Sequence, residues 1–598
     1  MKPRIKRRDV PEIAAQWPDR VHPVLRRVYA ARGIVAPTQI EHRLTNLLTP
    51  QSLSGIECAC ELLETAIRSD ARIVVVGDFD CDGATGTAVA VRGLRLLGAH
   101  QVGFAVPNRM RHGYGLSPAV VEELAPQQPD LLITVDNGVA AHAGVAAAKA
   151  RGMRVIVTDH HLPGETLPQA DAMVNPLLVR ESFAQESKSG HPWPHSSTTS
   201  SDGEALNHLA GVGVMFYLLL ALRARMREHA VFNELAIPEP DLGKLLDLVA
   251  LGTVADLVPL DRNNRILVEA GLKRIRSGRA CAGIAALLAA GKRDSACAVA
   301  SDLGFTVGPR LNAAGRLEDM TVGIECLLTE DTERAADLAG RLSAINAERR
   351  ELQDDMVAQA ETEVQKWIMQ RGTAGLPHGV VLFDPDWHHG VVGLVASKLK
   401  ETLHRPVIAC APAGKGSEEL KASGRSIPGF HLRDALAQID VRHPGLIARF
   451  GGHAMAAGLS LRRSDIDVFA AEFDAVARTR LATEDLEAIL LSDGELDPCD
   501  FTLEVAQQLR YAGPWGQGFA EPLFDGQFEV DSWRVVGEKH LKFKLRLAGL
   551  PVPLEAIRFN GYAGEPPPQR LRAAFALDVN EWNGVQSLQL LIRHVEPA

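Results

Sequence analysis

Short apolar runs alternate with amphipathic segments in the first half of the chain. The β-branched run at residues 73–76 predicts a buried strand, and "GATGTAVAVRGLRLLG" after it predicts a helix opened by a Gly-rich turn. "QVGFAVPNR", "DLLITVDNG" and "MRVIVTDHH" predict three further strands. This alternation is typical of an α/β fold and predicts a doubly wound parallel sheet.

The pattern changes in the second half of the chain. Apolar residues recur at spacings of three, four or seven between 342 and 364, which predicts a long amphipathic helix over about 338–368. A second, smaller α/β segment follows it. From about residue 492 short strands and turns such as "DGQFEV" and "HLKFKLRL" predict a small β domain.

A chain of 598 residues is too long for one hydrophobic core. We expect five parts, one of which contains a Ser-rich loop at 182–203. They are an N-terminal extension at 1–44, a large α/β domain at 45–337, a connecting helix at 338–370, a smaller α/β domain at 371–482 and a β domain at 483–598.

The composition is ordinary for a soluble globular protein, with 46% apolar and 23% charged residues. The chain contains no run of about 18 apolar residues, so no membrane span is expected. The basic N-terminus lacks the apolar core of a secretory signal. Eight scattered cysteines favour reduced thiols and a cytoplasmic location. The net charge of −10 argues weakly against non-specific nucleic-acid binding, although a local basic groove could still bind it.

"VVVGDFDCDGATG", at residues 74–86, places three aspartates and a glycine in the spacing of a calcium-binding EF-hand loop. Two features exclude that interpretation. The twelfth loop position counted from Asp78 is Val89 instead of glutamate, and the segment before the loop predicts a strand instead of a helix. Asp78, Asp80 and Asp82 therefore stand at the end of a predicted strand.

Acidic residues follow other predicted strands in the same way. Asp136 follows "LLITV", and Asp159, His160 and His161 follow "RVIVT". We expect Asp256 to follow a further strand-like segment, "LVALGTVA". The carboxyl ends of parallel strands meet at one edge, where ligands bind. One such aspartate is usually a helix cap or turn residue. Acids and histidines from four segments indicate a metal site that suits Mn²⁺ or Zn²⁺, or Mg²⁺ where oxygen ligands dominate.

The motifs "DFDCDG", "DNG" and "DHH" resemble the signature of the DHH phosphoesterase superfamily. Residues 45–598 resemble, in more detail, its family of single-stranded-DNA-specific exonucleases. The motifs that carry this resemblance keep their order and are "PNRMRHGYGL", "GTVADLVPL", "VGPRLNAAGRL", "WHHGVVGLVASKL", "SGRSIPGFHLRDAL", "RFGGHAMAAGL" and "PWGQGFAEPLFDG". Cys81 departs from the small apolar residue common at its position. The resemblance implies a DHH domain, a DHHA1 domain and an OB-fold-like barrel.

The resemblance also implies roles for individual residues. Two divalent ions would be bound by Asp80, Asp82, Asp136, His160 and Asp256. Mn²⁺ is the expected ion, and Mg²⁺ is the alternative. Asp78 and Asp159 would orient these ligands, and His161 would point toward the scissile phosphate. Substrate contacts are expected from Arg109, Arg310, Asn312, Arg316, Ser423, Arg425 and His453.

One strand predicts a further DNA contact from its own pattern. In "LKFKLRL" the apolar residues share one face, and Lys542, Lys544 and Arg546 share the other. Solvated decoration is the usual interpretation of such a face. On a barrel that resembles an OB-fold, however, we expect a track for the phosphates of a single strand.

The resemblance implies a 5′-to-3′ exonuclease that hydrolyses single-stranded DNA to 5′-mononucleotides in repair and recombination. Single-stranded-DNA-binding protein and a helicase are the implied partners, and a monomer is expected. The alternative is a DHH phosphodiesterase that acts on short oligonucleotides or cyclic dinucleotides, which would not need the C-terminal β domain. A non-catalytic scaffold is a third class, and the complete set of ligand residues argues against it.

Overall fold

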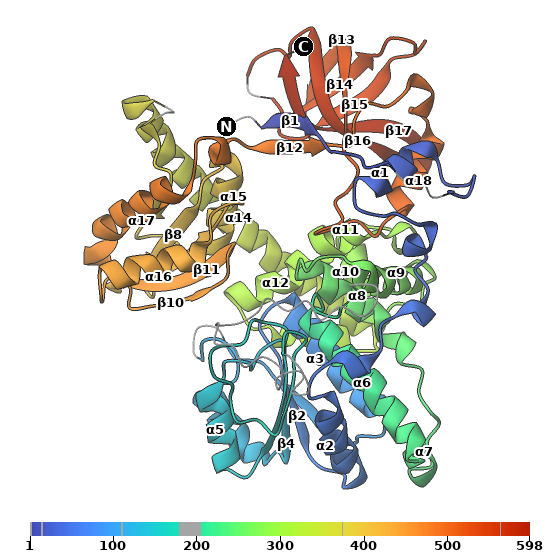
Figure 1. The fold of residues 1–598 in the computed structure, drawn as a ribbon, viewed down its shortest axis with the longest axis vertical. Helices are drawn as coiled ribbons and strands as arrows, with labels where there is room; N and C mark the ends of the chain where they lie inside the picture. Colours follow the sequence, from blue (N-terminus) through green and yellow to red (C-terminus); the bar gives the residue numbers. More distant parts are fainter. Residues whose placement is uncertain are drawn as a thin grey trace.

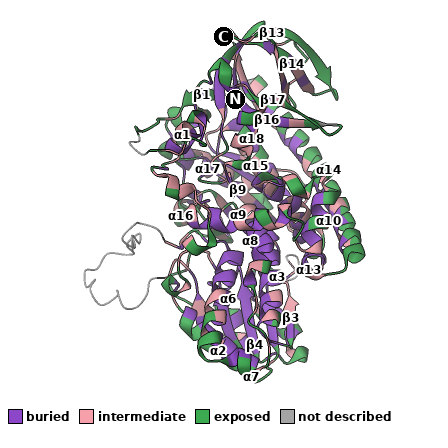
Figure 2. Cartoon of the chain, turned by 90° about the vertical axis from the view of Figure 1, so that its right-hand side faces the viewer, coloured by how far each residue is buried: buried purple, intermediate pink, exposed green. Residues whose placement is uncertain are grey.

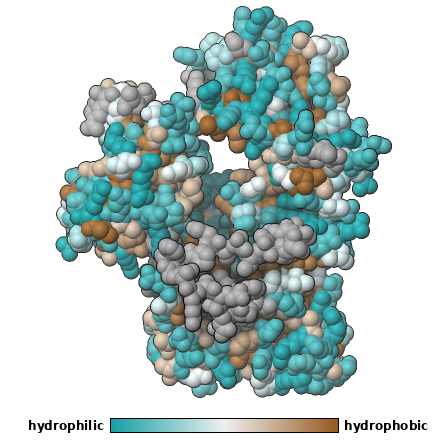
Figure 3. Space-filling view, in the orientation of Figure 1, coloured by the Kyte–Doolittle hydropathy of each residue, from teal (hydrophilic) through white to brown (hydrophobic). Residues whose placement is uncertain are grey.

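The computed structural model describes residues 3–12, 16–108, 112–178, 205–372, 375–562 and 564–597. Three lobes surround a central opening, which is visible between them in the space-filling view (Figure 3). The large α/β domain lies at the bottom of Figure 1, the smaller α/β domain at the left and the β-barrel at the top. The Ser-rich stretch 182–203 lies outside the described residues.

The large domain is built on a parallel sheet with the strand order β3-β2-β4-β5-β6. Its strands are β2 (Ile73–Val76), β3 (Val102–Ala105), β4 (Leu131–Val135), β5 (Arg154–Thr158) and β6 (Ala172–Val174). Because neighbouring side chains on a strand point to opposite faces, β2 contributes to two cores. Ile73 and Val75 belong to one apolar cluster, and Val74 and Val76 belong to another. The doubly wound sheet predicted from the sequence is confirmed.

Helices cover both faces of this sheet. Residues of α2 (Ile56–Arg68), α3 (Cys81–Leu96) and α6 (Gly211–Glu228) pack in the cluster with Ile73. Residues of α4 (Pro118–Leu124) and α5 (His142–Ala150) pack in the cluster with Val74. Figure 2 shows that α3, α6 and the sheet strands form the buried interior of this domain.

A helical layer connects the sheet to the remaining lobes. It contains α8 (Leu246–Ala255), α9 (Arg262–Arg276), α10 (Ala282–Ala290), a π-helical turn (Leu303–Val307), α12 (Gly308–Leu317) and α13 (Thr321–Leu328). The long helix α14 (Thr332–Arg371) follows and leads to the second α/β domain. Asp331 caps its N-terminus by accepting hydrogen bonds from the backbone N–H groups of Glu333 and Arg334.

The smaller α/β domain has a mixed sheet with the order β10-β11-β9-β8-β7. The strands are β7 (Val380–Phe383), β8 (Val407–Pro412), β9 (Glu419–Arg425), β10 (Arg449–Gly452) and β11 (Ala456–Arg462). Helix α15 (Val392–Leu403) shares an apolar cluster with the C-terminal half of α14. Helices α16 (Leu432–Arg442) and α17 (Ile466–Arg480) belong to a separate cluster with residues of β9 and β11.

The C-terminal strands form a closed barrel with the order β13-β14-β15-β17-β16. They are β13 (Phe524–Val536), β14 (His540–Arg546), β15 (Leu554–Arg558), β16 (Arg570–Trp582) and β17 (Val585–Pro597). Helix α18 (Leu503–Tyr511) precedes them. A five-stranded closed barrel of this order is the OB-fold, as expected from the sequence.

The N-terminal segment packs against the segment that leads into the barrel. Strand β1 (Arg4–Arg7) pairs in parallel with β12 (Ile489–Ser492), which leads into the barrel. The hydroxyl of Tyr29 in α1 (Pro23–Ala30) donates to the backbone oxygen of Ala512 at 2.8 Å. Over the described residues, no helix is long and apolar enough to cross a membrane.

Candidate metal centre

The turn between β2 and α3, together with the first turn of α3, carries the first three aspartates. Asp80 is the N-cap of α3, and its Oδ1 accepts a hydrogen bond from the backbone N–H of Gly83 at 3.0 Å. A Cβ at Gly83 would lie 2.6 Å from backbone atoms of Asp78, so only glycine fits this tight turn. Asp78 and Asp82 are buried on either side of it. The turn therefore serves as a helix cap and also gathers three carboxylates.

Asp82 is held by the N-terminus of a second helix. The backbone N–H groups of Gly211 and Val212 donate to its Oδ2 and Oδ1 at 2.6 and 2.9 Å. These bonds favour the carboxylate, but burial and the charge of Asp80 outweigh them and raise the pKa of Asp82 to about 7. Sequence reasoning missed this anchor, although a Gly-Val-Gly run that opens an apolar helix was a signal for it.

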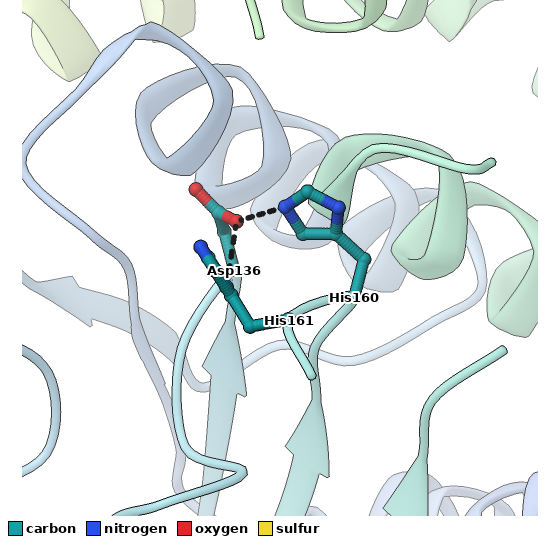
Figure 4. A group of neighbouring side chains, drawn as sticks. All are labelled: Asp136, His160 and His161. Carbon is teal, nitrogen blue, oxygen red and sulfur yellow. Dashed lines mark ion pairs between the residues drawn. The ribbon is translucent and has the colours of Figure 1, made fainter. Parts of the chain in front are cut away.

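His160 lies at the centre of the cluster. Its Nε2 is 3.1 Å from Asp136 Oδ1, 3.5 Å from Asp256 Oδ2 and 3.9 Å from Asp82 Oδ2. Figure 4 shows the His160 ring facing the carboxylate of Asp136. Burial, and the neighbouring His161 after it, lower the pKa of His160 to about 4. Its imidazole is therefore neutral near pH 7 and has a lone pair to offer a metal ion.

Three of these facing atoms are buried but make no hydrogen bond to any residue that the structure describes: Asp136 Oδ1, His160 Nε2 and Asp256 Oδ2. Buried polar atoms normally have partners, so such a group needs an explanation. Burial raises the pKa values of Asp136 and Asp256 well above the ordinary range, and the charge of Asp82 adds to this effect. A divalent cation between these atoms would satisfy the atoms and their charges together.

Among the residues that the structure describes, three groups of side chains have ligand atoms within 4.8 Å of one another, as a metal ion requires. They are Asp78, Asp80 and Asp136; Asp82, His160 and Asp256; and Asp136, His160 and His161. Asp136 and His160 each belong to two groups. The five residues expected from the sequence to hold the metal therefore come together, and Asp78, expected to orient them, also lies within ligand distance. This donor set of carboxylates and imidazole fits Mn²⁺ or Mg²⁺.

The sequence prediction was wrong about the element that carries Asp256. The segment before it is the helix α8, not a strand, and Asp256 is the C-cap of that helix. α8 is buried on nearly all sides, so its apolar residues show no clear helical period. The aspartate reaches the cluster from the helical layer and not from the edge of the sheet.

His161 is set by Asp159. The Nδ1 of His161 lies 2.8 Å from Asp159 Oδ1, which also accepts the backbone N–H groups of His160 and His161. Burial lowers the pKa of His161, but the hydrogen bond and charge of Asp159 outweigh it and raise that pKa above its usual value. Asp159 thus favours the protonated ring, which can donate a hydrogen bond.

Tyr114 is a neighbour of this site that sequence reasoning missed. Its hydroxyl donates to the backbone oxygen of Asp136 at 3.1 Å and lies 3.5 Å from His161 Nδ1. The signal was present, because Tyr114 stands in the motif "PNRMRHGYGL". Arg109, the residue of that motif expected to contact substrate, lies outside the described residues.

The helix α12 carries three residues that the sequence predicts as substrate contacts, and their surroundings differ. The Oδ1 of Asn312 accepts the backbone N–H of Cys81 at 2.7 Å, so its side chain positions the aspartate turn. Arg310 donates to Ser343 Oγ of α14 at 3.0 Å. Arg316 donates to the backbone oxygen of Gly390 at 3.3 Å and so links this domain to the smaller one.

The smaller domain contacts the cluster through His453. The ring of His453 is stacked on that of His161, with centroids 6.1 Å apart. Ser423 and Arg425 lie on β9, where Arg425 Nη1 donates to Ser423 Oγ at 3.0 Å. A Cβ at Gly393 would lie 3.0 Å from Ser423 Oγ and 3.1 Å from Arg425 Nη2, so this glycine leaves room for both side chains. Ser423 and Arg425 therefore lie on one strand, and His453 lies in the turn between β10 and β11, the strand that pairs with β9.

The cations of β14 alternate as the sequence predicts, but they have acidic neighbours. Leu541, Phe543 and Leu545 are buried in the barrel. On the outer face Lys542 and Lys544 lie 3.4 and 4.0 Å from Glu555, and Arg546 lies 2.6 Å from Asp531. This pairing weakens the expected DNA track, because each cation is partly neutralised before any phosphate arrives.

Comparison with known proteins assigns each lobe. The DHH family N-terminal domain matches residues 72–253, the DHHA1 domain matches 377–479, and the RecJ OB domain matches 492–594. The single-stranded-DNA-specific exonuclease RecJ of Dickeya dadantii is 50% identical over 98% of both chains. The protein of that name from Escherichia coli is 48% identical over 99% of both.

Solved structures agree with these sequence matches. RecJ of Thermus thermophilus in complex with Mn²⁺ superposes with a TM-score of 0.75 and 31% identity over 97% of this chain and 76% of that chain. Its complex with Mg²⁺ gives a TM-score of 0.69 and 30% identity over 97% and 75%. The lobes, the acidic centre and these relatives agree, and the chain belongs to the RecJ family of single-stranded-DNA-specific exonucleases.

Proposed function

We propose that this protein is a metal-dependent exonuclease that hydrolyses single-stranded DNA from its 5′ end and releases 5′-mononucleotides. The observation that carries the proposal is the cluster of buried, facing ligand atoms on Asp136, His160 and Asp256. Such a cluster has no structural use without cations, and divalent cations serve phosphoryl transfer. Family membership supports single-stranded DNA as the substrate, and we propose DNA repair and recombination as the setting.

We propose that two ions are bound, with Mn²⁺ preferred over Mg²⁺, by Asp80, Asp82, Asp136, His160 and Asp256. When bound, such ions polarise a phosphoryl oxygen and make water a better nucleophile. The chain contributes the geometry. Gly211 and Val212 fix Asp82, and Asp159 keeps a proton on His161. The Nδ1–H of His161 faces Asp159, so the Nε2–H of the protonated ring would donate a hydrogen bond to the scissile phosphate, where charge develops.

The polarity of cleavage rests on the smaller domain. A 5′-terminal phosphate needs a cationic cradle about one nucleotide from the metal centre. Arg425 and Ser423 are the candidates, and the stacked ring of His453 connects their domain to His161. Arg109 is a further candidate for this cradle, and Arg310 and Arg316 are proposed to supply further positive charge.

The barrel separates this function from the alternative. A phosphodiesterase for short oligonucleotides or cyclic dinucleotides has no use for a separate OB-fold, whereas a long single strand does. We retain Lys542, Lys544 and Arg546 as proposed phosphate contacts in spite of their acidic neighbours. Single-stranded-DNA-binding protein and a helicase are proposed partners on family membership alone, and we propose a monomer. The eight free cysteines support a cytoplasmic location.

A nuclease assay tests the proposal. The protein is incubated with Mn²⁺ and with single-stranded or blunt duplex DNA labelled at the 5′ end. We expect early release of labelled mononucleotide from the single strand and little from the duplex. Release of label only after extensive shortening would reverse the polarity. Cleavage confined to dinucleotides or cyclic dinucleotides would favour the alternative function.

A further inference from the structure

A pocket of about 510 Å³ lies between the helical layer of the large domain and the segment that enters the barrel. It is lined by residues 254–276 and 299–305 on one side and by 510–521 on the other. Both motifs involved, "GTVADLVPL" and "PWGQGFAEPLFDG", have no part in the metal centre apart from Asp256. Figure 1 places α11 (Ala300–Asp302), which lines the pocket, directly below the barrel and next to the opening seen in Figure 3.

Two walls of this pocket are continuous in sequence with the metal centre. Leu257 lines the pocket directly after Asp256 and has a φ of +61°, a conformation that costs free energy for a leucine. Phe305 lines it from the π-helical turn that leads into α12, the helix of Arg310 and Arg316. Strained residues and π-turns are frequent at functional sites. The pocket therefore lies next to the metal centre.

The pocket presents apolar and aromatic groups to solvent. Phe305 is 78% exposed, Leu257 is 67% exposed and Tyr511 is 44% exposed. The guanidinium of Arg276 lies 5.3 Å from the centroid of the Tyr511 ring, and that of Arg510 lies 5.9 Å from it. Flat apolar surfaces flanked by guanidinium groups are the features with which proteins bind the bases of single strands.

The charges of the pocket suit a neutral group on an anionic backbone. Arg276 lies 3.3 Å from Glu269, and Arg593 lies 3.7 Å from Glu521, so two of the three arginines are compensated. Arg510 adds the third cation, and two carboxylates accompany the three. A small surplus of positive charge beside apolar side chains favours a base with a phosphate nearby over a small free anion.

We propose that this pocket receives a base of the bound single strand, stacked on Phe305 and Tyr511, a short distance from the bond to be cleaved. This inference rests on the proposed function, because it assumes a single-stranded substrate. Stacking accepts any base, since every base has a π-face. The pocket would therefore hold the strand in register without selecting its sequence.

Abasic scanning tests the proposal. Single strands of about 20 nucleotides, each with one abasic site at a successive position, are bound to the protein in EDTA so that they are not cleaved. We expect one position, or two adjacent ones, at which the abasic site weakens binding by about tenfold. Phe305→Ala should bind the intact strand about tenfold more weakly than the wild type does. An abasic site at the sensitive position should then cause no further loss of affinity. Phe305→Tyr should restore the wild-type profile.

Val441→Ala is the matched control, because Val441 is 80% exposed on α16, far from the pocket in sequence. It should bind all strands as the wild type does. The same abasic profile in wild type and Phe305→Ala would overturn the proposal, as would equal affinity of both for the intact strand. If the wild type binds and shows this profile but releases no nucleotide with Mn²⁺, the pocket stands and the proposed function fails.

Discussion

The metal centre and the junction between the N-terminal segment and the barrel both bury aspartates, with opposite surroundings. At the junction Arg32 donates to both oxygens of Asp493, at 2.8 and 3.0 Å. Asp525 accepts hydrogen bonds from Arg7, Ser492 and Arg572. At the metal centre the titratable neighbours of Asp82 and Asp136 are other carboxylates, the neutral His160 and, 3.9 Å from Asp136 Oδ1, the Nδ1 of His161. Buried acids that meet arginines hold the fold together, whereas buried acids that meet each other need a cation.

The pKa values of the two regions move in opposite directions. Burial acts to raise the pKa of Asp525, but the hydrogen bonds from Arg7, Ser492 and Arg572 outweigh it and lower that pKa to about 2. Burial and carboxylate neighbours raise the pKa of Asp136. The first region gains stability from its charges, and the second gives stability up for function.

Removing a ligand from the metal centre should have the largest effect. We expect Asp82→Ala to lower hydrolysis of single-stranded DNA by more than about a thousandfold, because loss of a group that merely supports a ligand already costs about 10- to 100-fold. Single-strand binding should change little, since we propose that the binding contacts are spread over the other lobes. EDTA should mimic the substitution. Asp434→Ala, an exposed aspartate of α16, is the control, and robust hydrolysis by Asp82→Ala would contradict the assignment.

Breaking a compensated pair should instead destabilise the fold. We expect Asp493→Ala to lower the free energy of unfolding by about 3–5 kcal/mol, because the side chain of Arg32, 2% exposed, would keep a buried charge without its partner. Denaturant titration of the barrel transition measures this. The double variant Arg32→Leu/Asp493→Ala should lose less than the single one. A change no larger than that of Asp434→Ala would show that the pair is not a structural element.

The pH dependence of stability sharpens the comparison. Because the folded-state pKa of Asp525 is about 2, below its ordinary value of 3.8, the unfolded chain takes up this proton first as pH falls. Its contribution of about 2 kcal/mol is complete above about pH 4 and is lost between about pH 4 and pH 2. Asp525→Asn should lack this contribution at neutral pH and lose less stability in acid. Parallel stability curves for the two proteins would refute the interpretation.

The parallel sheet and most of the acidic cluster could be predicted from the sequence. β2, β4 and β5 are apolar runs with polar residues directly after them, and the geometry of parallel sheets places their carboxyl ends together. Asp256 could not be placed correctly, because α8 is apolar all round and a short apolar run does not distinguish helix from strand.

Contacts between segments that are distant in the sequence could not be predicted either. The alternation in β14 fixed which residues are buried, but the pairing of Lys544 with Glu555 depends on the register of β14 against β15. The anchor of Asp82 depends on where α6 begins in space, at Gly211. The base pocket joins residues more than 200 positions apart in the sequence, so periodicity within either segment gives no sign of it.

The smallest effect should be a gain of stability at the metal centre. Asp136 has a φ of +62°, a conformation that asparagine adopts readily, so Asp136→Asn changes the charge without straining the backbone. The pKa of Asp136 is raised in the folded protein, so at pH 8 folding without metal must either take up a proton or keep a buried negative charge among carboxylates. Asparagine avoids both costs. We therefore expect Asp136→Asn to be inactive but about 1 kcal/mol more stable than the wild type in EDTA.

Thermal unfolding in EDTA and again with Mn²⁺ measures this, with Asp434→Asn as the matched control. Mn²⁺ should stabilise the wild type and have less effect on Asp136→Asn, because the variant lacks a ligand. A variant less stable than the wild type in EDTA would mean that the Asp136 charge is compensated, as the charges of Asp493 and Asp525 are, and the contrast between the two regions would fail at its central residue.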